Sequence, residues 1–260
     1  MGNFKGTFYS ACLKRNVSIS VIFPDRSNDV DPLYEDEPKV LYLLHGLGGN
    51  EDEWTRFSKI EYYAKKYNFI IIIMPGVERS FYCNTCYGID YFDFVSEELP
   101  ALADKWFKIS TKKEDTFIAG ESMGGYGALK VALSRPERFA AAASLSGVVD
   151  YESFRKKIQN REFEEIKAEE LAFLYDQKTP YELAKETANR SDRPRLILQC
   201  GSEDFLLQDN RRFSAALKEL GYDHIYKEGP GDHEWPYWDK AIQDAFMFFR
   251  GLDIENGRLY

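Results

Sequence analysis

A G-x-S-x-G pentapeptide, Gly120-Glu121-Ser122-Met123-Gly124, lies between an apolar run at residues 116–119 and a helical stretch of small residues at 123–133. This context predicts a strand, a sharp turn and a helix in immediate succession, with the serine hydroxyl lifted clear of a sheet edge. Glycines stand two positions before and after the serine, where a Cβ would collide with neighbouring backbone. The pentapeptide alone also fits an ordinary glycine-rich turn, so its interpretation as a nucleophile elbow depends on the rest of the chain.

Further apolar runs of strand length surround the pentapeptide in the sequence. Continuous apolar runs are typical of strands that are buried on both faces of a parallel sheet. Such runs occupy residues 40–44 and 69–74, and further strand-like stretches follow at 139–145, 196–200 and 224–228. Each crossover between these stretches is long enough for a helix, as a parallel pair of strands requires. Residues 54–66 and 91–107 have helical periodicity, and Pro100 is an expected kink or break in the second of these ranges. We therefore predict an α/β fold with a mostly parallel, doubly wound sheet.

Two segments depart from this alternation of strands and helices. Residues 7–13 and 17–23 form two short β-type runs, which predict an antiparallel hairpin at the N-terminal edge of the sheet. Residues 150–193 contain no strand-like run, and Thr179-Pro180-Tyr181-Glu182 is a capping box that begins a helix. This short helical insertion fits either a set of surface helices or a small cap over a site. No linker divides the chain, so we expect a single domain over residues 1–260.

The composition argues against two classes of partner and gives expectations about location and metal binding. The formal net charge of −9 disfavours nucleic acid and anionic membrane, because both need a basic footprint on the protein. The N-terminus has no signal-peptide pattern and no apolar run reaches 18 residues, which favours a cytoplasmic protein. Cys83 and Cys86 form a lone C-x-x-C without a second pair or a nearby histidine, so we expect loop thiols and no metal site.

A serine nucleophile needs a base, and the chain has only three histidines from which to choose. His224 lies in an alternating strand-like run, and His45 precedes the serine, which is the wrong chain order for this kind of fold. His233 remains, in a loop between the last predicted strand and the last helix. The acid should follow another strand, because sites in open α/β sheets gather at the carboxyl ends of the strands. Asp204 is preferred there over Glu203 because it lies deeper in the loop, and it completes the order Ser122, Asp204, His233.

A tetrahedral oxyanion must be held by preorganised donors, usually backbone N–H groups. One predicted donor is the amide of Met123, which follows the nucleophile at a helix N-terminus. The other is the amide of Leu47, in the glycine loop after the strand at residues 40–44. The same glycines also suit an ordinary strand-to-helix turn.

Five blocks in order give the chain a family resemblance: His45-Gly-Leu-Gly-Gly-Asn-Glu-Asp-Glu-Trp54, Arg79-Ser-Phe-Tyr82, Gly120-Glu-Ser-Met-Gly-Gly-Tyr126, Gly201-Ser-Glu-Asp204 and His233-Glu-Trp-Pro-Tyr-Trp238. Together they resemble the esterase D-like family of α/β-hydrolases, and within it the bacterial tributyrin esterases. The resemblance implies the α/β-hydrolase fold, Ser122 as nucleophile, Asp204 as acid, His233 as base, and Leu47 and Met123 as oxyanion donors. Two departures stand out: relatives often have Thr-Asp where this chain continues with Cys83, and residue 121 is a glutamate.

These observations predict a serine carboxylesterase that hydrolyses short-chain acyl esters, with acetyl and cinnamoyl or feruloyl esters among the candidates, through an acyl-enzyme. The substrate is a small-molecule ester, and no metal or organic cofactor is needed. Trp54, Tyr82 and Trp235 are expected either as walls of the substrate pocket or as ordinary packing. The alternatives are hydrolysis of S-formylglutathione or acyl transfer on the same triad and, more remotely, a catalytically silent hydrolase fold used for binding. The oligomeric state, a homo-oligomer included, stays open.

Overall fold

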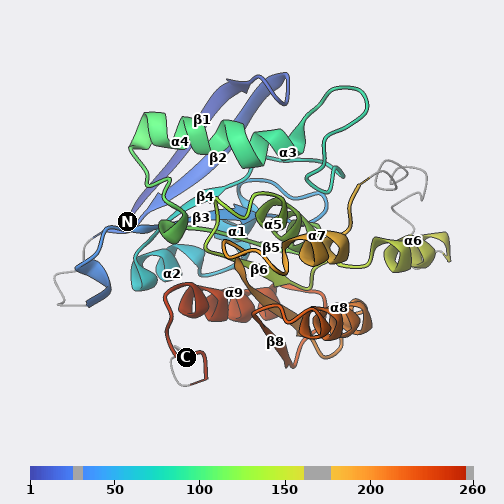
Figure 1. Cartoon of the computed structure of the whole chain (residues 1–260). Helices are drawn as coiled ribbons and strands as arrows, with labels where there is room; N and C mark the ends of the chain where they lie inside the picture. Colours follow the sequence, from blue (N-terminus) through green and yellow to red (C-terminus); the bar gives the residue numbers. More distant parts are fainter. Residues whose placement is uncertain (26–31, 161–176, 256–260) are drawn as a thin grey trace.

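The computed structural model describes residues 1–25, 32–160 and 177–255, shown as the coloured ribbon in Figure 1. Within these residues the strands form one sheet with the order β1-β2-β4-β3-β5-β6-β7-β8. The strands are β1 (Gly2–Ser10), β2 (Arg15–Phe23), β3 (Lys39–Leu44), β4 (Phe69–Ile73), β5 (Thr116–Glu121), β6 (Ala141–Leu145), β7 (Arg195–Gly201) and β8 (His224–Gly229). The pairs β1–β2 and β2–β4 are antiparallel, and every pair from β4 through β3 to β8 is parallel. The predicted mostly parallel sheet with an antiparallel N-terminal edge is confirmed.

Helices cover both faces of the sheet because successive strand side chains point to opposite sides. Val40, Tyr42 and Leu44 of β3 belong to one core, and Leu41 and Leu43 belong to the other. Helices α1 (Glu53–Phe57), α2 (Ile60–Tyr67) and α9 (Trp235–Phe249) cover the second core. The first core lies under α4 (Leu99–Phe107), α5 (Met123–Ser134), α6 (Tyr151–Gln159), α7 (Pro180–Thr187) and α8 (Leu207–Glu219). Figure 1 shows α2 and α9 on one side of the sheet and α4 and α5 on the other.

Two predicted helices differ in detail from what the periodicity indicates. The expected helix at residues 54–66 is divided into α1 and α2, because Ser58 adopts an extended conformation and its hydroxyl accepts from the amide of Ile60 at 3.3 Å. The stretch at 91–107 begins with the short α3 (Tyr91–Asp93) and a π-helical turn (Phe94–Glu98), and Pro100 lies in the first turn of α4. A proline is tolerated there because the first turn has no intrahelical acceptor for its missing N–H.

The predicted helical insertion at 150–193 is described in part. Asp150 caps α6 by accepting from the amide of Ser153 at 3.0 Å. The capping box that opens α7 is confirmed, since Thr179 Oγ1 accepts from the amide of Glu182 at 3.2 Å and the Glu182 carboxylate accepts from the amide of Thr179 at 2.8 Å. Residues 161–176 of the insertion lie outside the described residues. No helix within the described ranges has both the length and the apolar character that crossing a bilayer requires.

Candidate active site

The G-x-S-x-G pentapeptide is a tight turn from β5 into α5. Ser122 has φ of 55° and ψ of −117°, a conformation that a residue with a side chain rarely adopts and that stores strain. A Cβ on Gly120 would lie 2.5 Å from the backbone of Gly124, and a Cβ on Gly124 would lie 2.7 Å from the carbonyl oxygen of Leu44. The glycines thus let the strand, the turn and the neighbouring loop approach closely. Ser122 itself is partly exposed between two buried neighbours.

Two hydrogen bonds connect Ser122 with the other predicted members of the triad. Ser122 Oγ lies 2.9 Å from Nε2 of His233, and Nδ1 of the same ring lies 2.9 Å from Asp204 Oδ2. The three residues come from the turn after β5, the loop after β7 and the loop after β8. Because these strands are parallel, the loops meet at one edge of the sheet. The arrangement can pass a proton from the serine hydroxyl to the imidazole while the carboxylate holds the opposite ring nitrogen.

Asp204 has the environment of an ionised carboxylate in spite of its burial. Burial raises its pKa, but the hydrogen bond and the charge of His233 outweigh this effect, and the net pKa is lowered. Its second oxygen, Oδ1, accepts from the amide of Leu206 at 2.8 Å. The ring of His233 packs against those of Phe205 and Trp238, with centroid separations of 4.6 and 5.0 Å. The carboxylate and the two aromatic rings together fix the orientation of the imidazole.

The other candidates for acid and base point elsewhere. The carboxylate of Glu203 accepts from the amide of Gly231 at 2.6 Å and does not reach His233. His224 lies in β8, as predicted, and its ring bonds to Ser214 and to the carbonyl of Tyr222. His45 is completely buried, with Nδ1 at 2.8 Å from the carbonyl oxygen of Gly46 and Nε2 at 2.8 Å from that of Pro75. Within the described residues, only His233 of the three bonds to Ser122.

The two predicted oxyanion donors belong to neighbouring elements. Met123 is the first residue of α5, where a helix has unpaired amides and a partial positive charge. Leu47 lies in the loop after β3, whose backbone packs against the first turn of α5 at Gly124. Within the described residues neither amide donates to a protein acceptor. Both are therefore available to a ligand oxygen.

Two of the three aromatic residues predicted as pocket walls are buried instead. Trp54 and Tyr82 have no exposed surface, so their side chains cannot line an open pocket. Trp54 Nε1 donates to the carbonyl oxygen of Leu44 at 3.1 Å, and the Tyr82 hydroxyl bonds to the backbone of His45. Trp235 is half-buried and packs on Trp54, with a centroid separation of 5.1 Å. For Trp54 and Tyr82, the alternative of packing beneath the site therefore holds.

Glu121, the departure from the family pattern beside the serine, is also buried, with 2 % of its surface exposed. Its carboxyl group accepts from the amide of Gly46 in the loop after β3. Burial raises the pKa of this carboxyl well above its usual value, and the nearby charge of Glu53 also raises it, while the hydrogen bond from Gly46 lowers it. Sequence reasoning missed this contact, and it also missed Phe205 and Trp238, although each stands next to or within a block that carries the family resemblance.

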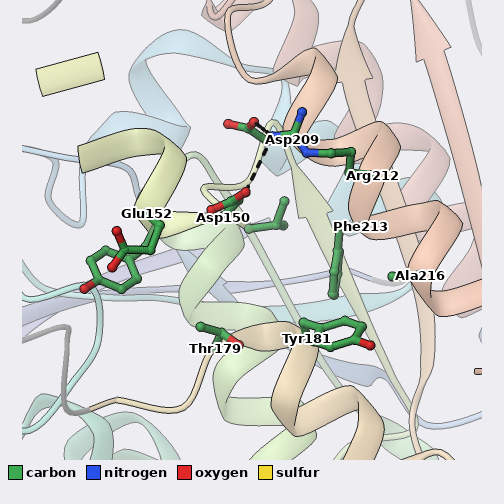
Figure 2. A pocket seen from close by; sticks show the side chains of 10 residues that line it. Asp150, Glu152, Thr179, Tyr181, Asp209, Arg212, Phe213 and Ala216 are labelled. Carbon is green, nitrogen blue, oxygen red and sulfur yellow. Dashed lines mark hydrogen bonds and ion pairs between the residues drawn. The ribbon is translucent and has the colours of Figure 1, made fainter. Parts of the chain in front are cut away.

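A pocket of about 250 Å³ opens between α6, α7 and α8 (Figure 2). It begins at Val149, one residue after Val148, whose amide donates to the carbonyl of Ser122 at 3.3 Å. Its walls include the ring of Phe213 and the methyl group of Ala216. Figure 2 shows the Arg212 guanidinium joined to two carboxylates, those of Asp150 and Asp209. The pocket is therefore partly apolar, with the ion-paired Arg212 at one side and the carboxylate of Glu152 at another.

The described residues contain no group of three or more His, Cys, Asp or Glu side chains that could hold a metal ion. Cys83 is buried and Cys86 is exposed. Neither cysteine is part of the hydrogen-bonded chain from Ser122 to Asp204.

Comparison with known proteins places these features in a family. The family model described as "Putative esterase" matches residues 10–249. An acetyl esterase of Caldicellulosiruptor saccharolyticus is 33% identical over 255 residues, which cover 92% of this chain and 94% of that protein. Among solved structures, the fluorophosphonate-binding serine hydrolase FphF of Staphylococcus aureus, with substrate bound, has a TM-score of 0.81 and 33% identity over 95% of this chain and 98% of its own. The S-formylglutathione hydrolase FrmB of Staphylococcus aureus has a TM-score of 0.80 and 32% identity over the same shares.

Proposed function

Because this chain belongs to the Esterase family and is a carboxylic ester hydrolase, we propose that it is a serine carboxylesterase that acts on short-chain esters, acetyl esters foremost, through an acyl-enzyme. The observation that carries the proposal is the chain of two 2.9 Å hydrogen bonds from Ser122 through His233 to Asp204. This chain begins at a serine that is partly exposed at the edge of the sheet while its neighbours are buried.

In the proposed mechanism His233 Nε2 takes the proton of Ser122 as Oγ attacks the acyl carbon. The negative charge that develops on the carbonyl oxygen is held by the amides of Leu47 and Met123. Asp204 keeps the proton on Nδ1 and stabilises the imidazolium that forms. His233 then protonates the leaving alcohol, and a water molecule, activated by the same ring, hydrolyses the acyl-enzyme.

The preference for acetyl esters rests on the relative that is an acetyl esterase with 33% identity. We assign acyl chains longer than acetyl to the pocket at Val149, because that segment adjoins the Ser122 backbone. A volume of about 250 Å³ is below the usual range for drug-sized ligands, so it suits one ring or a short alkyl chain.

Hydrolysis of S-formylglutathione is a second candidate, favoured by the 32% identity to the hydrolase with that name. The formyl group is the smallest acyl group, so the same triad would serve, and the difference would lie in recognition of the glutathione part. Acyl transfer to another alcohol uses the same acyl-enzyme with a different acceptor.

The test is a substrate panel of p-nitrophenyl esters from acetate to octanoate, together with methyl ferulate, acetylated xylan and S-formylglutathione. The proposal expects kcat/KM to be highest for acetate and to fall as the acyl chain lengthens. It also expects a burst of p-nitrophenol equal to the amount of enzyme, as an accumulating acyl-enzyme gives. A kcat/KM for S-formylglutathione that exceeds all oxygen esters would favour the second candidate.

A further inference from the structure

Three consecutive peptide groups, from Leu44 to Leu47, are held by hydrogen bonds from buried side chains. Each peptide group offers one carbonyl and one amide, and both need partners when they are buried. The side chains that supply these partners are those of Trp54, Tyr82, Glu121 and His45, which are all at most 2 % exposed. His45 belongs to the loop itself, and the other three come from separate parts of the chain.

The first two peptide groups share the hydroxyl of Tyr82. This hydroxyl accepts from the amide of His45 at 3.0 Å and donates to the carbonyl oxygen of the same residue at 2.8 Å. A phenol can do both because it has one proton and two lone pairs. Leu44 O is bound by Trp54 Nε1 at 3.1 Å, and the amide of Gly46 donates to the carboxyl group of Glu121. Both ends of the peptide group between His45 and Gly46 are thus fixed, by Tyr82 at the carbonyl and by Glu121 at the amide.

The third peptide group joins Gly46 to Leu47 and has only one end fixed. Its carbonyl oxygen lies 2.8 Å from His45 Nδ1 and accepts from the amide of Gly49 at 3.2 Å. In a planar trans peptide the N–H points opposite to the C=O. The Leu47 amide is therefore directed away from these partners, and within the described residues it has no protein acceptor. Its direction depends on how the preceding peptide group is held.

We propose that Glu121 and Tyr82 are positioning residues of the oxyanion hole, which fix the peptide group between His45 and Gly46 and so aim the Leu47 amide at the developing oxyanion. The inference rests on the proposed esterase function and assigns to it two residues that do not touch the substrate. They act through the backbone of the loop, and their effect is on the transition state because the bound ester carries no oxyanion, whereas negative charge develops on its carbonyl oxygen as the tetrahedral intermediate forms.

Glycines and an unusual backbone conformation let Glu121 and Tyr82 reach the loop from Leu44 to Leu47. A Cβ on Gly46 would lie within 3 Å of the Glu121 carboxyl group, and a Cβ on Gly127 of α5 would lie 2.3 Å from the ring of Tyr82. Phe81 and Tyr82 both have positive φ, 50° and 54°, which costs energy for residues with side chains. With this backbone conformation the Tyr82 side chain is fully buried and its hydroxyl reaches the loop.

The charge of Glu121 also matters, because an anion behind the oxyanion hole would oppose the charge that forms in front of it. Burial favours the neutral carboxyl group at this position. A neutral carboxyl still accepts from the Gly46 amide through its carbonyl oxygen. Glutamine is a close neutral analogue with the same acceptor, whereas leucine has the size of the side chain without an acceptor.

The experiment compares Glu121→Gln, Glu121→Leu and Tyr82→Phe with the wild-type enzyme. We measure kcat and KM for p-nitrophenyl acetate and the inhibition constant of a trifluoromethyl ketone, which forms an oxyanion on the serine. We expect Glu121→Leu and Tyr82→Phe to lower kcat by about 10- to 100-fold with KM within about threefold, and to weaken the ketone in parallel, since loss of a whole oxyanion donor costs about 10²- to 10³-fold. Glu121→Gln is expected to recover most of the lost kcat.

Tyr67→Phe is the matched control, because Tyr67 is equally buried and its hydroxyl bonds to Gln243 away from the loop. It should keep the wild-type kcat and ketone affinity. The inference is overturned if Glu121→Leu and Tyr82→Phe keep kcat within about twofold, or if Glu121→Gln loses as much as Glu121→Leu. If Glu121→Leu does not fold, Tyr82→Phe, which keeps the ring, decides the same question. A wild-type enzyme without Ser122-dependent hydrolysis would refute the proposed function itself, which is a separate outcome.

Discussion

Replacement of Asp204 by asparagine tests the proposed role of the acid through the proton on His233. The two oxygens of Asp204 have different partners: Oδ1 accepts from the Leu206 amide at 2.8 Å, and Oδ2 faces Nδ1 of His233 at 2.9 Å. An asparagine must keep its oxygen towards the Leu206 amide, because the NH₂ group cannot accept a hydrogen bond. Its NH₂ group therefore faces Nδ1. The imidazole must then carry its proton on Nε2, where it can no longer accept the proton of Ser122.

The expected magnitude follows from this change of tautomer. In a serine triad with the wrong tautomer kcat falls by about 10⁴-fold, which is about 5.5 kcal/mol in activation free energy. The side chains have the same shape, so KM should change by less than about threefold. The assay is steady-state hydrolysis of p-nitrophenyl acetate, with circular dichroism and thermal melting to establish that the variant is folded.

Glu203→Gln is the matched control, since Glu203 is the neighbouring acid and bonds to Gly231 rather than to His233. It should keep kcat within about twofold of the wild-type value. The reasoning is refuted if folded Asp204→Asn retains more than about a tenth of the wild-type kcat, or if Glu203→Gln is the more damaging of the two changes.

Three further predictions concern the surroundings of the site. Burial raises the pKa of Glu121 above 4.5, so the wild-type protein should lose stability relative to Glu121→Gln as the pH rises above that value. The difference in melting temperature between the two proteins should widen between about pH 5 and about pH 8. A constant difference would contradict a buried neutral carboxyl group. Ala216→Trp should fill the pocket at Val149 and so raise KM for p-nitrophenyl octanoate more than for p-nitrophenyl acetate, whereas Ala215→Trp, at an exposed position of the same helix, should not. If the two variants had equal effects on KM, the pocket would not be part of the substrate site. Gly120→Ala should lower the free energy of unfolding by about 3 kcal/mol or more because its Cβ would meet backbone at 2.5 Å, and Gly6→Ala, which meets nothing within 4 Å, is the control in urea titrations.

Much of the fold could be predicted because local patterns determine it. Continuous apolar runs with long crossovers predict a parallel sheet, and the capping box at Thr179 predicts the start of α7 at Pro180. The helix at 54–66 was wrongly predicted as continuous, since the interruption depends on the hydroxyl of Ser58, which periodicity does not reveal.

The site was predictable where chain order limits the choice. Three histidines and one fold-specific order lead to Ser122, Asp204 and His233, and the structure brings these side chains within hydrogen-bond distance. Their catalytic roles stay predictions. The burial of Tyr82 could not be predicted, because it depends on two successive residues with positive φ. The contact of Glu121 with Gly46 joins residues 75 positions apart, and no local pattern reports it.

The most direct test of the central claim is the effect of Ser122→Ala on hydrolysis of p-nitrophenyl acetate, measured together with labelling by a fluorophosphonate probe. The proposed function predicts that kcat falls by about 10⁴- to 10⁶-fold and that labelling of the protein disappears. Both follow because Ser122 Oγ is the atom that the ester acylates and that the probe phosphonylates. Activity within about tenfold of the wild-type value, or labelling that persists on the variant, would contradict it.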